Sequence, residues 1–435
     1  MIQIPKLNEI FLVSSVIGVA ISFKDVYLFH IVFGFIILLS FRNFTKSEYK
    51  IDFSYFSTKY IYFFPIFFCW YFLSIFWSIN KIYTIQYLFY IFCGLGIVFS
   101  FVSNINDQKK LKRATKILGL IFGLEIFFSI LEALTSFRLP ISPFSDVVIL
   151  FGREPSLQPS LDSFSIASII QPPTGFQWNP NDLAVTMIML VPFFLFLNRN
   201  IIKWIAIIAI SIIIIMTSSR TVLLSMGLLF FVYFIFYKKQ IMSVVLVIMI
   251  TSLFFTQIDR LKESENAQVS DIANTFSTIE DVLTDDLLIG QSLSIRQELA
   301  RNGIQAIQDS YGLGVGGGGS IAIQERLGGV DGRITSMHNF WLEIIVDSGI
   351  LFATLFFLWY ISLAWDLFKL GTESKNKNSK YLGKSISLSM IIFIPAAISA
   401  SSVIYFLPMW LLFGFAIATI EIESKLNFEE PQLYF

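Results

Sequence analysis

Three side chains in this sequence have the chemistry to bind an anion and to move a proton. His338 stands in Met337-His338-Asn339, at the start of an apolar run, and is one of only 2 histidines in the chain. A neutral imidazole, whose ordinary pKa is about 6.5, accepts a proton from a hydroxyl group at neutral pH. Arg220 and Arg296 carry planar guanidinium groups, which hold a phosphate through two parallel hydrogen bonds. Together these residues could combine a general base with an anion site.

A plainer interpretation of the histidine stays open. A polar residue at a helix start often only caps the helix, and His338 with Asn339 could do no more than that. His30 lies inside a predicted apolar span, residues 26–41, with no motif around it. We expect His30 to be a packing or interfacial residue.

The surroundings of the two arginines suggest where each one lies. Arg220 ends the polar run Thr217-Ser218-Ser219 between two apolar segments, so it is predicted at a membrane boundary, where a charge needs a polar cavity or a partner. Arg296 opens a predicted loop helix that runs from Ser294 to about Asp309, and it heads the apolar face while Arg301 falls off that face. We expect Arg296 to point toward packed protein and Arg301 toward water. The apolar face is formed by Ala300, Ile304 and Ile307.

The elements that must position these side chains are membrane helices. The chain is 55% hydrophobic and 14% charged, whereas a soluble domain has roughly 25% charged residues. Apolar runs long enough to cross a bilayer predict an all-α integral membrane protein with about twelve transmembrane helices. No basic, short apolar leader with a small-residue cleavage site opens the chain, so we expect the first span to be retained. The predicted spans are 8–23, 26–41, 60–78, 83–103, 117–136, 182–197, 204–218, 221–237, 240–255, 338–365, 385–403 and 405–421.

The basic residues predict the orientation of these spans. With both termini cytoplasmic, about two thirds of the 31 lysines and arginines lie in short inside segments, as the positive-inside rule requires. The predicted outside is biased toward arginine, which suggests recognition of an anion there; anchoring of loops at lipid headgroups is the alternative. The outer arginines are Arg138, Arg153, Arg220, Arg260, Arg296, Arg301, Arg326 and Arg333.

Several polar residues in apolar surroundings are secondary candidates. Glu125 with Glu132 on the fifth span, and Glu343 with Asp347 on the tenth, have helical spacing, and intramembrane carboxylates of this kind could pair the arginines or line a groove. Asn181 belongs to the same set of possible supporting residues. For Asn181 and Asp182, however, we favour a role as the N-terminal cap of the sixth span.

Metal chemistry has little support in the sequence. Cys69 and Cys93 lie within spans, and the chain has no histidine or cysteine cluster with the spacing of metal ligands. The acidic pair Asp285-Asp286 has no second ligand-bearing element in view. We therefore expect no metal and no cofactor.

Two further stretches could contact a ligand. Residues 311–320 are rich in glycine, which permits close approach of backbone N–H groups to an anion, but a flexible hinge is the favoured interpretation. In the polar stretch 137–181, Phe176 and Trp178 could stack on a sugar, although headgroup anchoring explains Trp178 equally well.

The order and spacing of these motifs resemble the O-antigen ligase and polymerase superfamily. The resemblance is seen in Thr174-Gly175-Phe176, Asn179-Pro180-Asn181-Asp182, Ser218-Ser219-Arg220, Arg296 with Gly312-Leu313-Gly314, and His338-Asn339 leading into Asp347-Ser348-Gly349. It covers roughly residues 170 to 350 by motif.

The resemblance implies a metal-independent glycosyltransferase of the bacterial plasma membrane. Such a protein takes a glycan from an undecaprenyl-diphosphate carrier on the outer side of the membrane. Arg220 and Arg296 would hold the diphosphate and His338 would act as base, with Asn339, Arg301, Glu343, Asp347 and Asn181 as possible supporting residues. The expected partners are the lipid-linked donor, a glycan or lipid A-core acceptor and membrane lipids, and no nucleic acid.

Three functions remain open at this point. A polymerase of polysaccharide repeat units is favoured, a ligase that transfers the glycan to lipid A-core is the second, and a transporter of lipid-linked sugars is the third. A transporter usually places its charges at mid-membrane, whereas the candidate charges here gather at one face. The predicted division of the chain is 1–255 with an outer loop at 137–181, an extracytoplasmic loop with short helices at 256–337, and a C-terminal part at 338–435.

Overall fold

The described chain consists of helices and one small hairpin. The computed structural model describes residues 4–45, 59–155, 172–238, 291–329, 335–401 and 403–429. Strands β1 (Ser22–Phe23) and β2 (Val26–Tyr27) pair in antiparallel register, with Lys24 in the left-handed region at φ 50°. The helices are α1 (Ile4–Ile17), α2 (Leu28–Thr45), α3 (Phe63–Leu73), α4 (Lys81–Asn104), α5 (Gln108–Leu134), α6 (Pro180–Leu195), α7 (Asn200–Met216), α8 (Arg220–Val232), α12 (Gln291–Asp309), α13 (Gly319–Arg326), α14 (Phe340–Glu373), α15 (Lys377–Ala396) and α16 (Leu407–Glu429).

The helices confirm the prediction of a multi-pass membrane protein. Within the described residues, 5 helices are long and apolar enough to cross a bilayer, and shorter apolar helices accompany them. These helices are fewer than the roughly twelve predicted spans, because several apolar helices are shorter than 18 residues. The ninth predicted span, 240–255, lies outside the described residues. The long helices are Lys81–Asn104, Gln108–Leu134, Arg220–Lys238, Phe340–Glu373 and Leu407–Lys425.

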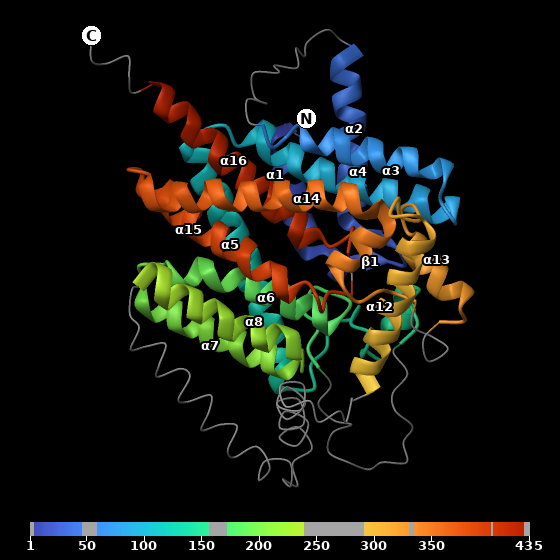
Figure 1. Ribbon diagram of the computed structural model, residues 1–435. Coiled ribbons are helices and arrows are strands. Elements are labelled where there is room, and N and C mark those ends of the chain that lie inside the picture. The colour runs from blue at the N-terminus through green and yellow to red at the C-terminus, as the bar shows by residue number, and fades with distance from the viewer. Residues whose placement is uncertain are drawn as a thin grey trace.

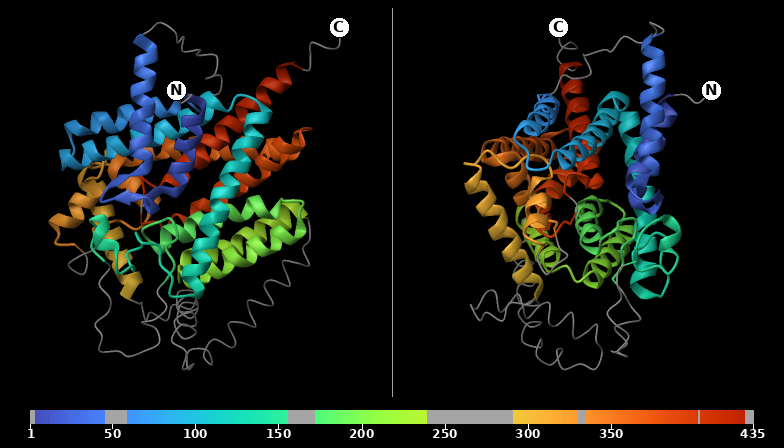
Figure 2. Two further views of the ribbon diagram at one scale, coloured as in Figure 1. Left: turned by 180° about the vertical axis from the view of Figure 1, so that it is seen from behind. Right: turned by 90° about the vertical axis from the view of Figure 1, so that its right-hand side faces the viewer.

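The long helices form a bundle with α16 in its interior. α15 packs between α14 and α6, and α16 packs against α4. Figure 1 shows α14 and α15 side by side, with α3 and α4 on one side of them and α7 and α8 on the other. In the views of Figure 2, α1, α2 and α5 cover the back of the bundle. The apolar window of α16 is 89% buried, against 22% for α8, so α16 is the central helix and α8 lies at the periphery.

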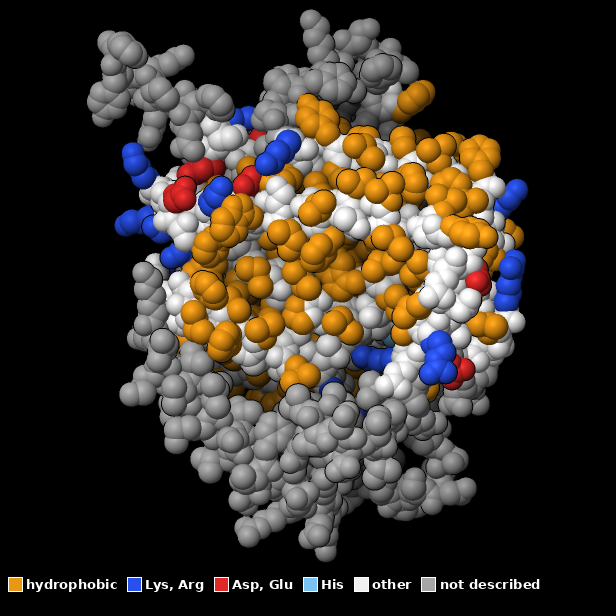
Figure 3. All heavy atoms as spheres, viewed as in Figure 1, with side chains coloured by type: hydrophobic (Ala, Val, Ile, Leu, Met, Phe, Trp, Pro, Cys, Tyr) orange, Lys and Arg blue, Asp and Glu red, His pale blue; other side chains and the backbone are white. Residues whose placement is uncertain are grey.

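The surface of the bundle has the pattern expected of a lipid-facing protein. Figure 3 shows hydrophobic side chains across the middle of the visible face and charged side chains toward its two edges. On α14, Leu351, Leu355 and Leu358 are exposed. Contiguous exposed apolar surface of this extent is rare on soluble monomers and suits a hydrocarbon environment.

A break in α14 shapes the region where the candidate residues lie. Gly349 has φ 82° and ψ 165°, which interrupts the helix. The carbonyl groups of Val346 and Asp347 then accept hydrogen bonds from Val315 and Gly316, at 2.9 and 3.0 Å. Buried backbone groups must form hydrogen bonds within the protein, and the glycine-rich segment supplies the partners here.

The glycines of residues 312–318 make close contacts that were not predicted. A Cβ atom at Gly314 would lie 2.4 Å from the backbone nitrogen of Gly349, which is far below van der Waals contact. The backbone N–H groups of Gly318 and Ser320 donate to the carboxylate of Asp347, each at 2.8 Å. These two donors are therefore already satisfied by an internal carboxyl group, and the glycines serve close backbone packing.

Replacing Gly314 by alanine tests this packing. We expect a clear loss of stability, because the new Cβ meets backbone atoms that cannot turn away. Gly328→Ala is the matched control: Gly328 has φ 87° but open space around it, so only the strain of about 1–2 kcal/mol for a left-handed backbone applies. Thermal unfolding in detergent, followed by tryptophan fluorescence, should show the larger drop in midpoint for Gly314→Ala. Equal drops for the two variants would contradict the packing role.

Candidate active site

His338 does not cap α14 but turns toward a different segment. Asn339 is the N-cap, and its side chain accepts a hydrogen bond from the backbone nitrogen of Leu342 at 3.2 Å. His338 has a left-handed backbone at φ 46°, which is uncommon for a residue other than glycine. Its Nδ1 atom lies 3.0 Å from the Oγ atom of Ser401. Ser336 Oγ also donates to the carbonyl of Ser401 at 3.1 Å, so the segment before α14 is fixed against the segment after α15.

Ser401 is itself held by the start of α6. Its backbone nitrogen donates to the Asp182 carboxylate at 2.8 Å. The predicted end of the eleventh span, residue 403, is therefore too late. α15 ends at Ala396, and the residues after it form an irregular segment that reaches His338 and Asp182.

The cap of α6 also differs from the prediction. Asn179 is the N-cap, and its side chain accepts from the backbone nitrogen of Asn181 at 2.8 Å. Pro180 follows at the first helical position, where its missing N–H costs nothing. The prediction that Asn181 and Asp182 cap this helix was wrong, and the Asp182 carboxylate instead accepts from the backbone nitrogen of Ser401.

Arg220 is positioned by the same irregular segment. It is the first residue of α8 and follows a tight turn in which Ser218 has φ 53°. Ser219 Oγ donates to Ser399 Oγ at 3.3 Å, which fixes this turn against the residues after α15. His338 and Arg220 are thus anchored to neighbouring serines of one segment, residues 397–401.

Arg296, on α12, completes an electrostatic cluster with these two residues. Burial, together with the positive charge of Arg220, lowers the pKa of Arg296. Burial, together with the charge of Arg296, lowers the pKa of His338 to about 4. Because charges act at this strength only over short range, the three side chains share one neighbourhood. Among the described residues, neither Arg220 nor Arg296 forms an ion pair with a carboxylate.

The packing of α12 corrects one detail of the prediction. Arg296 is half-buried and Arg301 is exposed, as expected, but Ile304 is 51% exposed. The face that packs against the protein continues instead from Arg296 through Leu299, Gly303 and Ala306. A Cβ atom at Gly303 would lie 2.7 Å from Met337 Cε, so this glycine lets α12 approach the segment that carries His338.

Three of the other arginines that were predicted on the outer side form structural hydrogen bonds. Arg138, Arg153 and Arg326 donate to the backbone carbonyls of Glu132, Lys24 and Ile79, respectively. Arg260 and Arg333 lie outside the described residues. Arg220 and Arg296 therefore remain the cations best placed to meet an anion.

The predicted carboxylates form hydrogen bonds that hold the surrounding loops. Glu132 accepts from the backbone nitrogens of Thr174 and Gly175, at 2.8 and 2.7 Å, and Glu125 accepts from Gln177 at 3.1 Å. Both glutamates of α5 therefore fix the turn that leads into α6.

On α14, Glu343 accepts from the Tyr87 hydroxyl at 2.7 Å, and Asp347 binds the start of α13. Neither Glu343 nor Asp347 forms an ion pair with an arginine in the described part of the chain. Nor does any group of three metal-ligating side chains occur there, and Asp285-Asp286 lies outside it.

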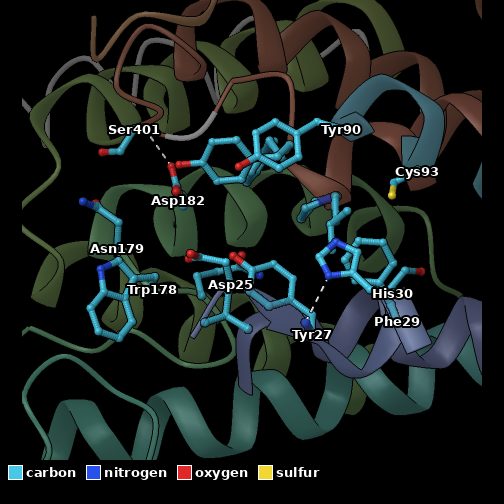
Figure 4. A pocket seen from close by; sticks show the side chains of 18 of the residues that line it. Asp25, Tyr27, Phe29, His30, Tyr90, Cys93, Trp178, Asn179, Asp182 and Ser401 are labelled. Atoms are coloured by element: carbon cyan, nitrogen blue, oxygen red, sulfur yellow. Dashed lines mark hydrogen bonds between the residues drawn. The ribbon is translucent and has the colours of Figure 1, made fainter. Parts of the chain in front are cut away.

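A cavity beside this cluster was not predicted. It has a volume of about 430 Å³ and is lined by the hairpin, α4, the turn before α6 and the segment after α15. Figure 4 shows Asp25 and Asp182 directed into the cavity, with Trp178, Tyr27 and Tyr90 around it. Ser401 also lines it, so the cavity adjoins His338.

The N-terminal part of the chain therefore supplies side chains to the cavity, in addition to apolar helices. His30 lines the cavity and accepts from the backbone nitrogen of Tyr27 at 3.1 Å, whereas Phe176 is buried against Phe128. Sequence spacing could not reveal a site assembled from segments so far apart. The one indication in the sequence was the group of tyrosines on α4, Tyr83, Tyr87 and Tyr90, which line the cavity.

Comparison with known proteins places the cluster in a family. Residues 204–357 match the family model described as O-Antigen ligase, and they include Arg220, Arg296 and His338. This part of the chain is a domain of the O-antigen ligase family. The chain is also similar to the teichuronic acid biosynthesis protein TuaE of Bacillus subtilis (strain 168), with 27% identity over 128 residues. The alignment covers 29% of this chain and 26% of that relative.

The extent of the match separates two parts of the site. The O-antigen ligase domain contains the two arginines and the histidine, whereas Asp182, Ser401 and most of the cavity lie outside it. The cavity is therefore built mostly by parts of this chain that the family model does not cover.

The pKa of His338 provides a test of the electrostatic cluster. Arg296→Gln removes a positive charge that disfavours the imidazolium form, so we expect the pKa of His338 to rise from about 4 toward 6.5. Histidine NMR of labelled protein in nanodiscs would report it, with His30→Gln as background so that one histidine signal remains. Arg301→Gln removes an exposed charge from the same helix and should leave the titration unchanged. An unchanged titration in Arg296→Gln would show that the two groups are not neighbours.

Proposed function

We propose that this protein is a glycosyltransferase that takes a glycan from an undecaprenyl-diphosphate carrier and transfers it to a sugar hydroxyl. The observation that carries the proposal is that residues 397–401 hold both His338 and the turn before Arg220, while Arg296 interacts electrostatically with both side chains. Two cations without a carboxylate partner in the described chain suit a diphosphate, and a neutral imidazole beside them suits a base.

The arginines act on the leaving group. When the bond between the sugar C1 atom and the diphosphate breaks, negative charge accumulates on the diphosphate oxygens. Guanidinium groups that are already fixed in place stabilise this charge without having to reorganise, and the effect is larger where water is excluded. Arg220 is fixed through the turn that Ser219 anchors, and Arg296 through the packing of α12.

His338 takes the proton of the attacking hydroxyl. Its pKa of about 4 keeps the imidazole neutral, and therefore able to accept a proton, at any physiological pH. A bound diphosphate offsets the charge of Arg296 and so raises the pKa of His338. Donor binding thereby strengthens the base at the moment when it is needed.

The similarities favour a polymerase of repeat units, with a ligase as the second candidate. The relative of Bacillus subtilis is named for the biosynthesis of teichuronic acid, which favours polymer formation. The matched family model is described as O-Antigen ligase, which favours transfer to a lipid A-core acceptor. We place the site on the outer side of the plasma membrane, with both termini cytoplasmic and no metal requirement.

Glycan transfer by purified protein tests the proposal. The wild type in nanodiscs, given undecaprenyl-diphosphate-linked repeat unit and EDTA, is expected to form a ladder of products on a gel. His338→Ala and Arg220→Ala should each reduce the rate by at least about 10²-fold, because one removes the base and the other a stabilising charge. Arg301→Ala should retain activity, because Arg301 is exposed on α12.

The other outcomes discriminate between the alternatives. Transfer to lipid A-core but not to repeat units identifies a ligase. Inactivity with both acceptors, in protein whose unfolding midpoint is normal, rejects the enzyme and favours a transporter. Dependence of the rate on an added divalent cation contradicts the metal-independent reaction.

A further inference from the structure

The cavity of about 430 Å³ adjoins the candidate base His338 through Ser401, whereas the two candidate diphosphate-binding arginines do not line it. Ser401 and Asp182 line it, and Ser401 contacts His338. Arg220 and Arg296 are not among its lining residues. His338 therefore interacts with two different regions: the arginine cluster through electrostatics, and the cavity through Ser401.

The walls of the cavity have the chemistry of a sugar site. Tyr27, Tyr90, Tyr405 and Trp178 offer aromatic surface, on which the apolar face of a pyranose ring can lie. Asp25 and Asp182 offer carboxylate oxygens that accept hydrogen bonds from sugar hydroxyls. Figure 4 shows both carboxylates directed into the same space. The volume falls in the range of about 300–1,000 Å³ that is usual for small-molecule sites.

The rigidity of these walls supports recognition of a defined ligand. The Arg153 guanidinium lies 4.5 Å from the centre of the Trp178 ring, and its Nη2 atom donates to the Lys24 carbonyl at 2.6 Å. This contact joins the hairpin that carries Asp25 to the turn that carries Trp178. On the opposite wall, the Gln86 amide donates to the Tyr90 hydroxyl at 2.5 Å.

The charges of the cavity select among sugars. The carboxylates Asp25 and Asp182 face the space, and the one cation among the lining residues, Arg153, already donates to a backbone carbonyl and stacks on Trp178. A uronic acid would meet like charge, whereas a neutral sugar offers hydroxyl donors to both carboxylates. A diphosphate group would also fit this cavity poorly, because its negative charge would be repelled by the two carboxylates.

We propose that this cavity binds a neutral pyranose of the acceptor glycan and presents its attacking hydroxyl to Ser401, which connects it to His338. This inference rests on the proposed function and assigns the acceptor half of the same site. It also gives a role to residues outside the O-antigen ligase domain, namely Asp25, Trp178 and Ser401.

In the proposed transfer step, Ser401 relays a proton from the acceptor hydroxyl to His338. The acceptor oxygen forms a bond to C1 of the donor sugar while the bond from C1 to the diphosphate oxygen breaks, and the diphosphate leaves with that electron pair. The acceptor proton passes to Ser401 Oγ as the hydroxyl proton of Ser401 passes to His338 Nδ1, over the observed 3.0 Å. Asp182 keeps Ser401 in place through its backbone nitrogen.

Direct binding tests the cavity independently of transfer. The probes are methyl β-glucopyranoside, methyl β-glucuronide and the repeat-unit oligosaccharide released from the carrier lipid of the source cells by mild acid. Saturation-transfer NMR with protein in nanodiscs should show contact with the neutral probe and the oligosaccharide, and weaker contact with the glucuronide. Asp25→Asn and Trp178→Ala should weaken the signal, whereas the matched controls Asp146→Asn and Trp204→Ala, which replace exposed residues away from the cavity, should not.

Kinetics tests the link to His338. In the transfer assay, Asp25→Asn should raise KM for the acceptor about tenfold and leave KM for the lipid-linked donor unchanged. Ser401→Ala should lower kcat by about 10²-fold, and Ser401→Thr, which restores a hydroxyl, should recover much of it. A structural role for Ser401 would instead make both variants unstable.

The outcomes separate this inference from the proposed function. Sugar binding that depends on Asp25 and Trp178, in a protein that transfers no glycan, keeps the cavity as a sugar site and rejects the transfer reaction. Normal transfer with an unchanged acceptor KM in both cavity variants overturns the acceptor site. Equal contact with the glucuronide overturns the selection for neutral sugars.

Discussion

The hydrogen bonding around the break in α14 is the constraint on which the rest of the site depends. The interruption at Gly349 leaves buried backbone carbonyls of α14 that need partners from elsewhere in the protein. Residues 312–320 supply these partners, because their backbone N–H groups donate to the carbonyls of Val346 and Asp347. Further N–H groups of the same segment donate to the Asp347 carboxylate. The same segment connects α12, with Arg296, to α13. The break therefore fixes the position of one candidate side chain relative to the helix that His338 precedes.

Arg220, Arg296 and His338 form a cluster with unfavourable electrostatic interactions, which a bound anion would relieve. Arg220 and Arg296 repel each other, and His338 is kept neutral beside them and has a left-handed backbone. None of these features stabilises the fold, so the surrounding hydrogen bonds of Ser219, Ser336 and Ser401 must maintain them. Strain that is held in place by neighbouring structure is common at functional sites, because it keeps the groups ready for the ligand.

The sequence predicts the helices well because apolar runs in a membrane protein are long and distinct. It also singles out His338, Arg220 and Arg296, whose chemistry is visible from residue type and position. The failures have a common cause: Ser401, Asp182 and Asp25 come from separate segments, and each contributes through one long-range contact or a shared cavity. Local spacing also misplaced the packed face of α12, because Gly303, which has no side chain, marks the closest approach.

The enclosed position of α16 has a consequence for how the molecule is made. α16 packs against α4, yet residues 105–406 separate the two helices, and α16 follows every other described helix. During synthesis the earlier helices are made first, so they cannot complete their packing around α16 until it follows. Final assembly of the bundle is therefore postponed until the ribosome has delivered this helix. The segment that bears Ser401 lies directly before α16, so we expect the cavity and its link to His338 to form only once this helix has docked.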